Sequence, residues 1–277
     1  MKSTTEVSWL KSHYLDEKVR VIDCRFKLGE PDYGKKLYKE SHIPGAVYFD
    51  LEEDLSGEVK KHGGRHPLPK IDDFVRKLEQ AGIENDTTVV VYDDGEGAFA
   101  ARCWWLFKYI GHEDVSILNG GYQGWKRHDL PVTRKVVNYS VREYQPQAQN
   151  DMIASVDDVR NISGKGILVD SRARERYLGL YEPIDKVPGH IPGAVNHVWT
   201  EALKDGSFRP AAEQRKRWKE LDPNLPVIVY CGSGVTATPN VLSLWSAGFQ
   251  NVKLYPGSYS DWISYEEHEV ETNNEND

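Results

Sequence analysis

Residues 227–237 read VIVYCGSGVTA, and this stretch indicates the fold class of the chain. Its first four residues are β-branched or aromatic, which is typical of a short strand buried on both faces of a parallel sheet. Gly232 and Gly234 then allow a tight turn, and an apolar helical run follows through Leu242 and Leu244. A buried strand, a glycine turn and a helix form one unit of an α/β fold, in which ligands bind beyond the carboxyl ends of the strands.

The sequence around this stretch occurs twice. Four motifs recur in the same order: residues 21–25 match 168–172, 42–47 match 190–195, 89–93 match 227–231, and 120–125 loosely match 257–262. Such self-similarity predicts two copies of one domain, each long enough to fold alone. We expect a first domain over residues 1–138, a polar linker without clear period over 139–152, and a second domain over 153–277.

Short β-branched runs alternate with helical patterns in both copies. Strands are expected at residues 19–23, 88–92, 115–118, 167–170, 227–230 and 252–254. Helices are expected between them, for example at 71–81 and 98–110, each followed by a glycine. The alternation predicts an α/β fold of two tandem domains, each a mostly parallel sheet flanked by helices on both faces.

Composition narrows the classes of function. Of the 277 residues 39% are hydrophobic, which is enough to form a core. The net charge of −8, from 35 basic and 43 acidic residues, argues against nucleic acid or an anionic membrane as the main partner. The N-terminus has no apolar stretch, so we expect no secretory signal. Three cysteines favour a reducing compartment over a disulfide scaffold, and we expect a cytoplasmic protein.

Cys231 is the candidate nucleophile. It stands between a buried strand and a helix, and the two glycines after it let successive N–H groups point inward as an anion-binding nest near a helix N-terminus. We expect this setting to favour the thiolate, and the same amides to hold a negative group on the sulfur. A buried structural cysteine is the alternative interpretation. The equivalent residue of the first copy is Asp93, which cannot perform thiol chemistry, so a catalytic site is expected in the second copy alone.

These features together resemble the tandem-domain rhodanese-like sulfurtransferases, over nearly the whole chain. The resemblance rests on the two domains, the paired HIPGA motifs at residues 42–46 and 190–194, the Asp-x-Arg after an early strand, and the CGSGVTA loop. Within the family, Gly232 and Ser233 resemble the 3-mercaptopyruvate type, because the thiosulfate type usually has Arg and Lys there. The aspartate of the first copy fits the family pattern of an inactive N-terminal domain.

The resemblance implies a ping-pong sulfur transfer that needs no metal and no organic cofactor. Cys231 would take a sulfur from a small anionic donor, 3-mercaptopyruvate or thiosulfate, and become a persulfide. A thiol or cyanide, or a thioredoxin-like reductant, would then remove the sulfur. The loop residues expected to hold the persulfide are Gly232, Ser233, Gly234, Val235 and Thr236.

An anionic donor also needs a cation. By resemblance, Arg176 is the substrate-binding arginine, Arg172 forms a structural pair with Asp170, and Arg174 is interpreted as a solvated surface charge. The 3-mercaptopyruvate enzymes carry a second substrate arginine shortly after the first. Residues 179–186 of this chain, GLYEPIDK, contain no arginine, which leaves the choice of donor open.

Ser233 is expected to donate a hydrogen bond to the donor or to its leaving enolate. In the family it is proposed to work with a histidine and an acid from the first domain, which here would be His66 and Glu52. The site is therefore expected in the second domain, at the interface with the first. The alternative interpretations are an exposed loop histidine and a solvated acidic run.

Other polar residues are better explained by structure. His42 and His190 occupy matching positions in the two copies and lack neighbours at metal-ligand spacing, so we expect a repeated structural role. Cys24 and Cys103 lie in apolar surroundings and are expected in the core.

Two other functions remain as hypotheses. A phosphatase of the same domain class needs Cys-x5-Arg, and Ala237 stands where that arginine would be. A non-catalytic persulfide carrier or sensor would use the same Cys231 loop, but it would load once and not turn over.

Overall fold

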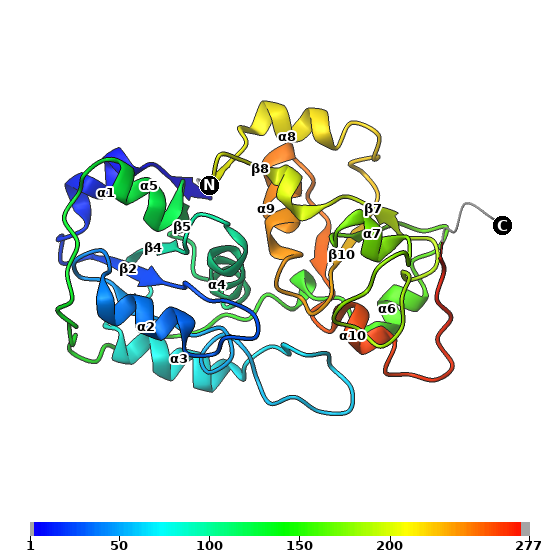
Figure 1. Cartoon of the computed structure of the whole chain (residues 1–277), viewed down its shortest axis with the longest axis horizontal. Coiled ribbons are helices and arrows are strands. Elements are labelled where there is room, and N and C mark those ends of the chain that lie inside the picture. Colours follow the sequence, from blue (N-terminus) through cyan, green and yellow to red (C-terminus); the bar gives the residue numbers. More distant parts are fainter. Residues whose placement is uncertain (1–2, 273–277) are drawn as a thin grey trace. The chain divides into compact units, whose positions relative to one another are not determined.

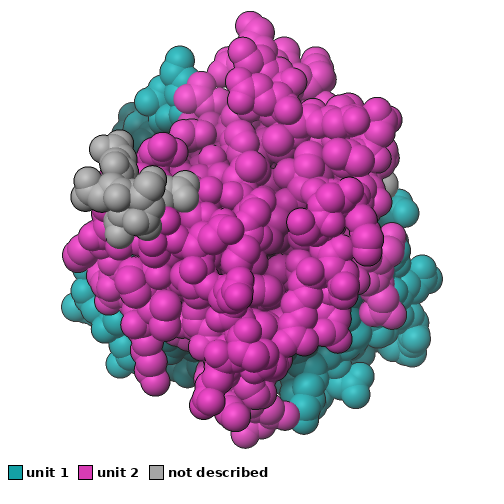
Figure 2. Space-filling model, turned by 90° about the vertical axis from the view of Figure 1, so that its right-hand side faces the viewer, with its two compact units in different colours: residues 1–57, 68–149, 204–208 teal, residues 58–67, 150–203, 209–277 magenta. Residues whose placement is uncertain are grey.

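The alternation of strands and helices builds two separate units in the computed structural model, which describes residues 3–272 (Figure 1). Unit 1 comprises Met1–Gly57, Leu68–Gln149 and Lys204–Phe208, and unit 2 comprises Glu58–Pro67, Asn150–Leu203 and Arg209–Asp277 (Figure 2). The main division falls between Gln149 and Asn150, within the stretch expected as a linker. Each unit also includes a short segment from the other half of the sequence.

Unit 1 is built on a five-stranded parallel sheet in the order β1-β5-β4-β2-β3. Its strands are β1 (Thr4–Thr5), β2 (Val19–Asp23), β3 (Val47–Tyr48), β4 (Thr88–Tyr92) and β5 (Val115–Leu118). Its helices are α1 (Val7–His13), α2 (Tyr33–Glu40), α3 (Ile71–Gln80), α4 (Ala98–Tyr109) and α5 (Gly121–Arg127). The central strand β4 is buried on both faces, because successive side chains point to opposite sides of a sheet.

The core of unit 1 shows why these strands are so apolar. Helices α1 and α5 lie together on one face of the sheet (Figure 1), and their Leu10 and Trp125 pack in one buried cluster with Val90 and Tyr92 of β4. Val89 and Val91 point to the opposite face and are also fully buried. Burial of both faces leaves no polar alternation along the strand, so the sequence there reads as a continuous apolar run.

Unit 2 repeats this plan with four parallel strands in the order β11-β10-β6-β7. The strands are β6 (Ile167–Asp170), β7 (Val195–Asn196), β10 (Val227–Tyr230) and β11 (Val252–Leu254). The helices are η1 (Asn150–Met152), α6 (Val156–Arg160), α7 (Arg174–Tyr177), η2 (Trp199–Ala202), α8 (Ala211–Arg217), α9 (Thr238–Ala247) and α10 (Ser258–Trp262). A bridge between Ile153 and Leu254 stands where β1 pairs with β5 in unit 1. Strands β8 (Leu203–Lys204) and β9 (Ser207–Phe208) form a separate two-stranded sheet, and all of it except Leu203 belongs to unit 1.

The expected fold is confirmed: both units are parallel α/β sheets with helices on their faces. The six expected strands have the predicted bounds, and α3 and α4 each end one residue before the prediction. Gly82 and Gly111, which follow those helices, have φ of 68° and 82°, the left-handed conformation that favours glycine at a helix end. Within residues 3–272, no helix combines the length and the apolar character that crossing a membrane requires.

Candidate active site

The candidate nucleophile Cys231 lies at the carboxyl edge of the unit 2 sheet. It directly follows β10, whose last residue Tyr230 is paired in register with Asp170, the last residue of β6. Residues from two neighbouring strands therefore emerge at one place. Cys231 is 1% exposed, and its Sγ accepts a hydrogen bond from the N–H of Gly234 at 3.2 Å.

The N-terminal part of α10 orients the loop after Cys231. The carbonyl oxygens of Cys231 and Gly232 accept hydrogen bonds from the N–H groups of Tyr259 and Ser260, at 2.9 and 3.0 Å. Because N–H and C=O point in opposite directions across a trans peptide, the N–H groups of Gly232 and Ser233 face away from α10. No hydrogen bond described within residues 3–272 uses either of these two N–H groups. Successive N–H groups that face the same way are the arrangement of a nest.

Any residue larger than glycine would be strained at position 234. Its φ is 77°, and a Cβ there would lie 2.3 Å from the carbonyl oxygen of Pro256, which is backbone. A side chain would therefore both strain the backbone and push the loop away from the segment that precedes α10.

Ser233 is paired with the predicted histidine. His66 Nδ1 and Ser233 Oγ are 2.8 Å apart, a hydrogen-bond distance, and each of the two residues is 8% exposed. His66 belongs to the segment Glu58–Pro67 of unit 2, which is anchored on α10: Gly63 N–H donates to Asp261 Oδ1 at 2.7 Å and Arg65 N–H donates to Ser260 Oγ at 3.2 Å. A histidine encoded in the first half of the sequence thereby reaches the loop of the second.

Two guanidinium groups approach the loop at Gly232. A Cβ placed on that glycine would lie 2.9 Å from Nη2 of Arg65 and 3.4 Å from Nη2 of Arg176. Arg176 is the predicted substrate-binding residue, whereas Arg65 was not predicted. Residue type alone could have suggested Arg65, since it directly precedes His66.

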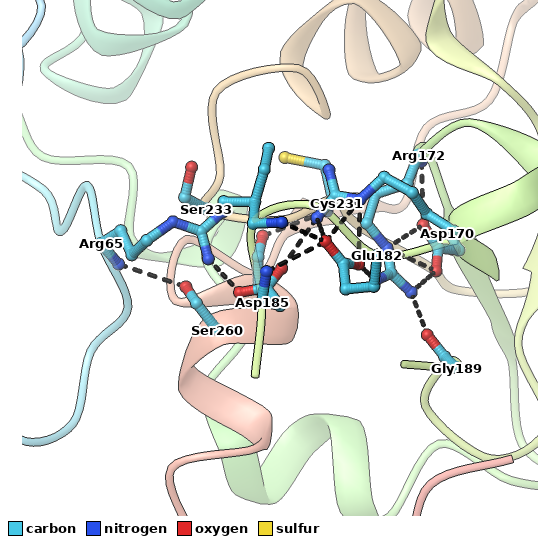
Figure 3. Close-up of polar contacts among 12 residues, drawn as sticks. Arg65, Asp170, Arg172, Glu182, Asp185, Gly189, Cys231, Ser233 and Ser260 are labelled. Carbon is cyan, nitrogen blue, oxygen red and sulfur yellow. Dashed lines mark hydrogen bonds and ion pairs between the residues drawn. The ribbon is translucent and has the colours of Figure 1, made fainter. Parts of the chain in front are cut away.

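Buried carboxylates balance these arginines (Figure 3). Asp185 bridges the two, with Oδ1 paired to Arg65 and Oδ2 at 2.8 Å from Nη2 of Arg176. Glu182 accepts from Nε of Arg176 at 2.9 and 3.0 Å and pairs with Arg172 at 3.3 Å. The side chains of Glu182 and Asp185 are 3% and 2% exposed.

Burial affects the two acids differently. It works to raise the pKa of Glu182, but hydrogen bonds from Arg176 and from the N–H groups of Asp185 and Ile184 hold that pKa below its ordinary value. For Asp185, burial outweighs the nearby arginines and raises the pKa. The negative charge is therefore better stabilised on Glu182 than on Asp185.

The expected Asp170–Arg172 pair is present and is repeated in unit 1. Arg172 Nη2 lies 2.6 Å from Asp170 Oδ2, and Arg25 Nη2 lies 2.6 Å from Asp23 Oδ2. All four side chains are buried. The pair occurs in the unit without the cysteine as well, so it supports the sheet edge in both copies.

Asp93 takes the place of Cys231 in unit 1 and fills its own nest. Its two carboxylate oxygens accept hydrogen bonds from the N–H groups of Gly95, Gly97, Phe99 and Ala100, at 2.9, 2.9, 3.1 and 3.2 Å. Burial raises the pKa of Asp93, and the four donors work against that rise. The loop of unit 1 therefore already binds an anion supplied by the chain itself.

The remaining predicted residues have simpler surroundings. His42 and His190 each stack on a tyrosine, with ring centroids 4.0 and 3.8 Å apart, and each places Nδ1 at a backbone carbonyl, as a repeated structural role requires. Cys24 and Cys103 are buried. Glu52 is exposed in unit 1, in the turn after Asp50. Within residues 3–272 no group of His, Cys, Asp and Glu side chains is arranged to hold a metal ion.

Comparison with known proteins identifies the family of the chain. The sequence profile of the rhodanese-like domain matches the chain twice, at residues 6–128 and 155–265. The chain therefore belongs to the rhodanese-like family, in its tandem form.

Its relatives specify the class of enzyme. A probable 3-mercaptopyruvate sulfurtransferase of Pseudomonas aeruginosa is 44% identical over 252 residues, covering 88% of this chain and 89% of the relative. A putative thiosulfate sulfurtransferase of Mycobacterium tuberculosis is 36% identical over 256 residues, covering 90% and 89%. The crystal structure of SseA from Escherichia coli, described as a 3-mercaptopyruvate sulfotransferase with the rhodanese fold, matches with a TM-score of 0.84 and 33% identity over 94% of this chain and all of that one. The chain is thus a sulfurtransferase.

Proposed function

We propose that the enzyme transfers a sulfane sulfur from a small anionic donor to a thiol or to cyanide through a persulfide on Cys231, and that 3-mercaptopyruvate is the preferred donor. The observation that supports this proposal is the geometry of the loop that begins at Cys231. A buried Sγ accepts the Gly234 N–H, two further loop N–H groups face away from α10, and two guanidinium groups stand beside Gly232. Thiolate, persulfide and donor are all anions, which N–H donors and arginines recognise.

In the first half-reaction the Cys231 thiolate attacks the sulfur of 3-mercaptopyruvate. The S–S bond forms as the C–S bond breaks, and the electron pair of that bond leaves with the organic fragment as the enolate of pyruvate. One proton converts the enolate to pyruvate. Ser233 Oγ–H supplies that proton, and the S–H proton that the donor sulfur loses when the persulfide anion forms returns to the serine through His66, whose Nδ1 is 2.8 Å from Oγ.

In the second half-reaction an acceptor thiolate or cyanide attacks the outer sulfur of the persulfide. A new S–S or C–S bond forms, and Cys231 leaves as the thiolate that begins the next cycle. The loop N–H groups hold the negative charge at each stage. A small thiol or a thioredoxin-like protein would serve as the acceptor in a reducing compartment such as the cytoplasm.

Residues 153–277 with the segment Glu58–Pro67 form the catalytic part in this proposal, and residues 1–138 carry the copy whose nest Asp93 fills. Arg65 lies beside Gly232 and would supply the second donor-binding arginine, which residues 179–186 do not contain. The presence of Arg65 favours a carboxylate donor, although residues 179–186 contain no arginine. The contribution of Glu52 remains a prediction.

Steady-state turnover tests the proposal, with 3-mercaptopyruvate and thiosulfate as separate donors and cyanide as the common acceptor. We expect a higher kcat/KM with 3-mercaptopyruvate, and no turnover by Cys231→Ser. Cys24→Ala is the matched control, since it also replaces a buried cysteine, and it should keep wild-type rates. A preference for thiosulfate would contradict the assigned donor, and turnover by Cys231→Ser would contradict the assigned nucleophile. Loading without turnover would make the protein a persulfide carrier.

A further inference from the structure

The two arginines beside the Cys231 loop are already paired within the chain. Arg65 and Arg176 come from segments far apart in sequence, and both approach Gly232. The side chain of Asp185 bridges them with one carboxylate oxygen each, and it is 2% exposed. Figure 3 shows Asp185 between Arg65 and Glu182, below the loop that carries Cys231.

The charges of this cluster cancel. Its members are Arg65, Arg172 and Arg176 on the positive side and Asp170, Glu182 and Asp185 on the negative side. An anionic donor that simply joined the cluster would add an unpaired charge to a largely buried site, which is costly. An incoming carboxylate must therefore replace one of the three that the chain supplies.

Asp185 is the carboxylate that the chain holds least firmly. Asp170 accepts the N–H of Arg172 as well as its guanidinium, at the end of a strand. Glu182 accepts two backbone N–H groups in addition to its arginines. For the carboxylate of Asp185, the structure of residues 3–272 gives the two arginines alone as hydrogen-bond or ion-pair partners.

The segment around Asp185 is also irregular and partly exposed. It lies outside the helices and strands, and its neighbours Tyr181 and Ile184 are 66% and 50% exposed. Moving this turn would cost little buried apolar surface.

We propose that Asp185 occupies the binding position of the donor's carboxylate, and that a donor binds by displacing Asp185 from Arg65 and Arg176. Asp185 is thus an internal competitor that sets the affinity for donors. The inference deepens the proposed function and rests on it for the identity of the donor.

The chemistry of the displaced group indicates which donors fit. The end of the Asp185 side chain is a carboxylate on one CH₂ group, so the position between the arginines accommodates a monocarboxylate on a short chain. A three-carbon 2-keto acid satisfies that description, and pyruvate, the product of the proposed first step, does as well. Each carboxylate oxygen would take over one guanidinium.

Binding of pyruvate tests this directly. The probe is pyruvate itself, and calorimetric titration of the full chain gives its Kd in wild type and in Asp185→Asn, which removes the competing charge but keeps the size. We expect Asp185→Asn to bind pyruvate about tenfold more tightly, the effect of roughly one charged hydrogen bond. In turnover the same variant should lower the KM for 3-mercaptopyruvate.

Glu175→Gln is the matched control. Glu175 is exposed on α7, and the substitution changes the net charge of the chain equally. The Kd of Glu175→Gln for pyruvate should stay at the wild-type value. If both variants bound pyruvate equally more tightly than wild type, the cause would be the net charge of the chain, and the proposal would be overturned. Weaker or unchanged binding by Asp185→Asn would show instead that Asp185 holds the arginines in place.

A measurement on the wild-type protein tests the proposal even if the Asp185→Asn variant misfolds. The N–H groups of Ile184 and Asp185 donate to Glu182, so their hydrogen exchange reports on this turn. Saturating pyruvate should accelerate that exchange if Asp185 is displaced, and slowed or unchanged exchange would overturn the proposal. The pyruvate experiments need no sulfur transfer. A failure to form a persulfide on Cys231 would therefore refute the proposed function alone.

Discussion

Gly234→Ala is the sharpest perturbation of the loop that binds the sulfur. The residue has φ of 77°, and its N–H donates to Sγ of Cys231 at 3.2 Å. A Cβ at this position would lie 2.3 Å from the Pro256 carbonyl oxygen. Because that oxygen is part of the backbone, the clash is relieved by moving the loop, and movement of the loop displaces the N–H from the sulfur.

The magnitude follows from two effects. A non-glycine residue in the left-handed region costs about 1–2 kcal/mol. Forcing an extra methyl group into a packed site costs a further ~1–3 kcal/mol. We therefore expect Gly234→Ala to lower the free energy of unfolding by about 2–5 kcal/mol, and to reduce kcat by roughly a hundredfold through loss of an anion-stabilising donor.

Gly164→Ala is the matched control, because Gly164 has a similar φ of 70° but open space where its Cβ would lie. It should show the conformational cost alone, about 1–2 kcal/mol, and wild-type kcat. Urea unfolding followed by tryptophan fluorescence, together with steady-state rates, measures both variants. If Gly234→Ala proves as stable and as active as Gly164→Ala, the assigned loop geometry is wrong.

Three further predictions follow from the same structure. Arg65→Gln should raise the KM for 3-mercaptopyruvate about tenfold or more while kcat changes less, and an unchanged KM in steady-state assays would remove Arg65 from the donor site. Asp93→Asn places an amide among four N–H donors, so it should lower the free energy of unfolding in urea by about 1–3 kcal/mol without changing kcat. A large loss of activity would instead give the first copy a direct role in catalysis. Burial lowers the pKa of His197 below its ordinary value, so the unfolded state binds more protons and stability falls as the pH drops below about 6.5. His197→Gln should flatten the fall between pH 7 and 5, and an unchanged slope in unfolding titrations would contradict this.

The strands that could be predicted from sequence are those buried on both faces. Val90 and Tyr92 pack under α1 and α5 while Val89 and Val91 are buried on the other side, so the run is apolar at every residue and easily recognised. Strands β1, β3 and β7 were not predicted, because each has two residues and two residues show no period.

The residues of the candidate site also differ in whether the sequence alone could predict them. Cys231 could be predicted because strand, cysteine and glycine turn are adjacent in sequence. Asp185 could not, and Arg65 had its place beside His66 as a weak signal, because the two residues meet across 120 positions and both lie in irregular segments. Residues 179–186 contain no arginine and supply the carboxylates of Glu182 and Asp185 to this cluster, whereas Arg65 comes from the segment Glu58–Pro67.

Mapping the sulfur after a single half-reaction tests the central claim most directly. The protein is mixed with 3-mercaptopyruvate without an acceptor, digested, and its cysteine peptides are analysed by mass spectrometry. The account predicts one added sulfur atom on the peptide of Cys231, none on those of Cys24 and Cys103, and its release as thiocyanate when cyanide is added. An unmodified Cys231 in a protein that still releases thiocyanate from 3-mercaptopyruvate would contradict it.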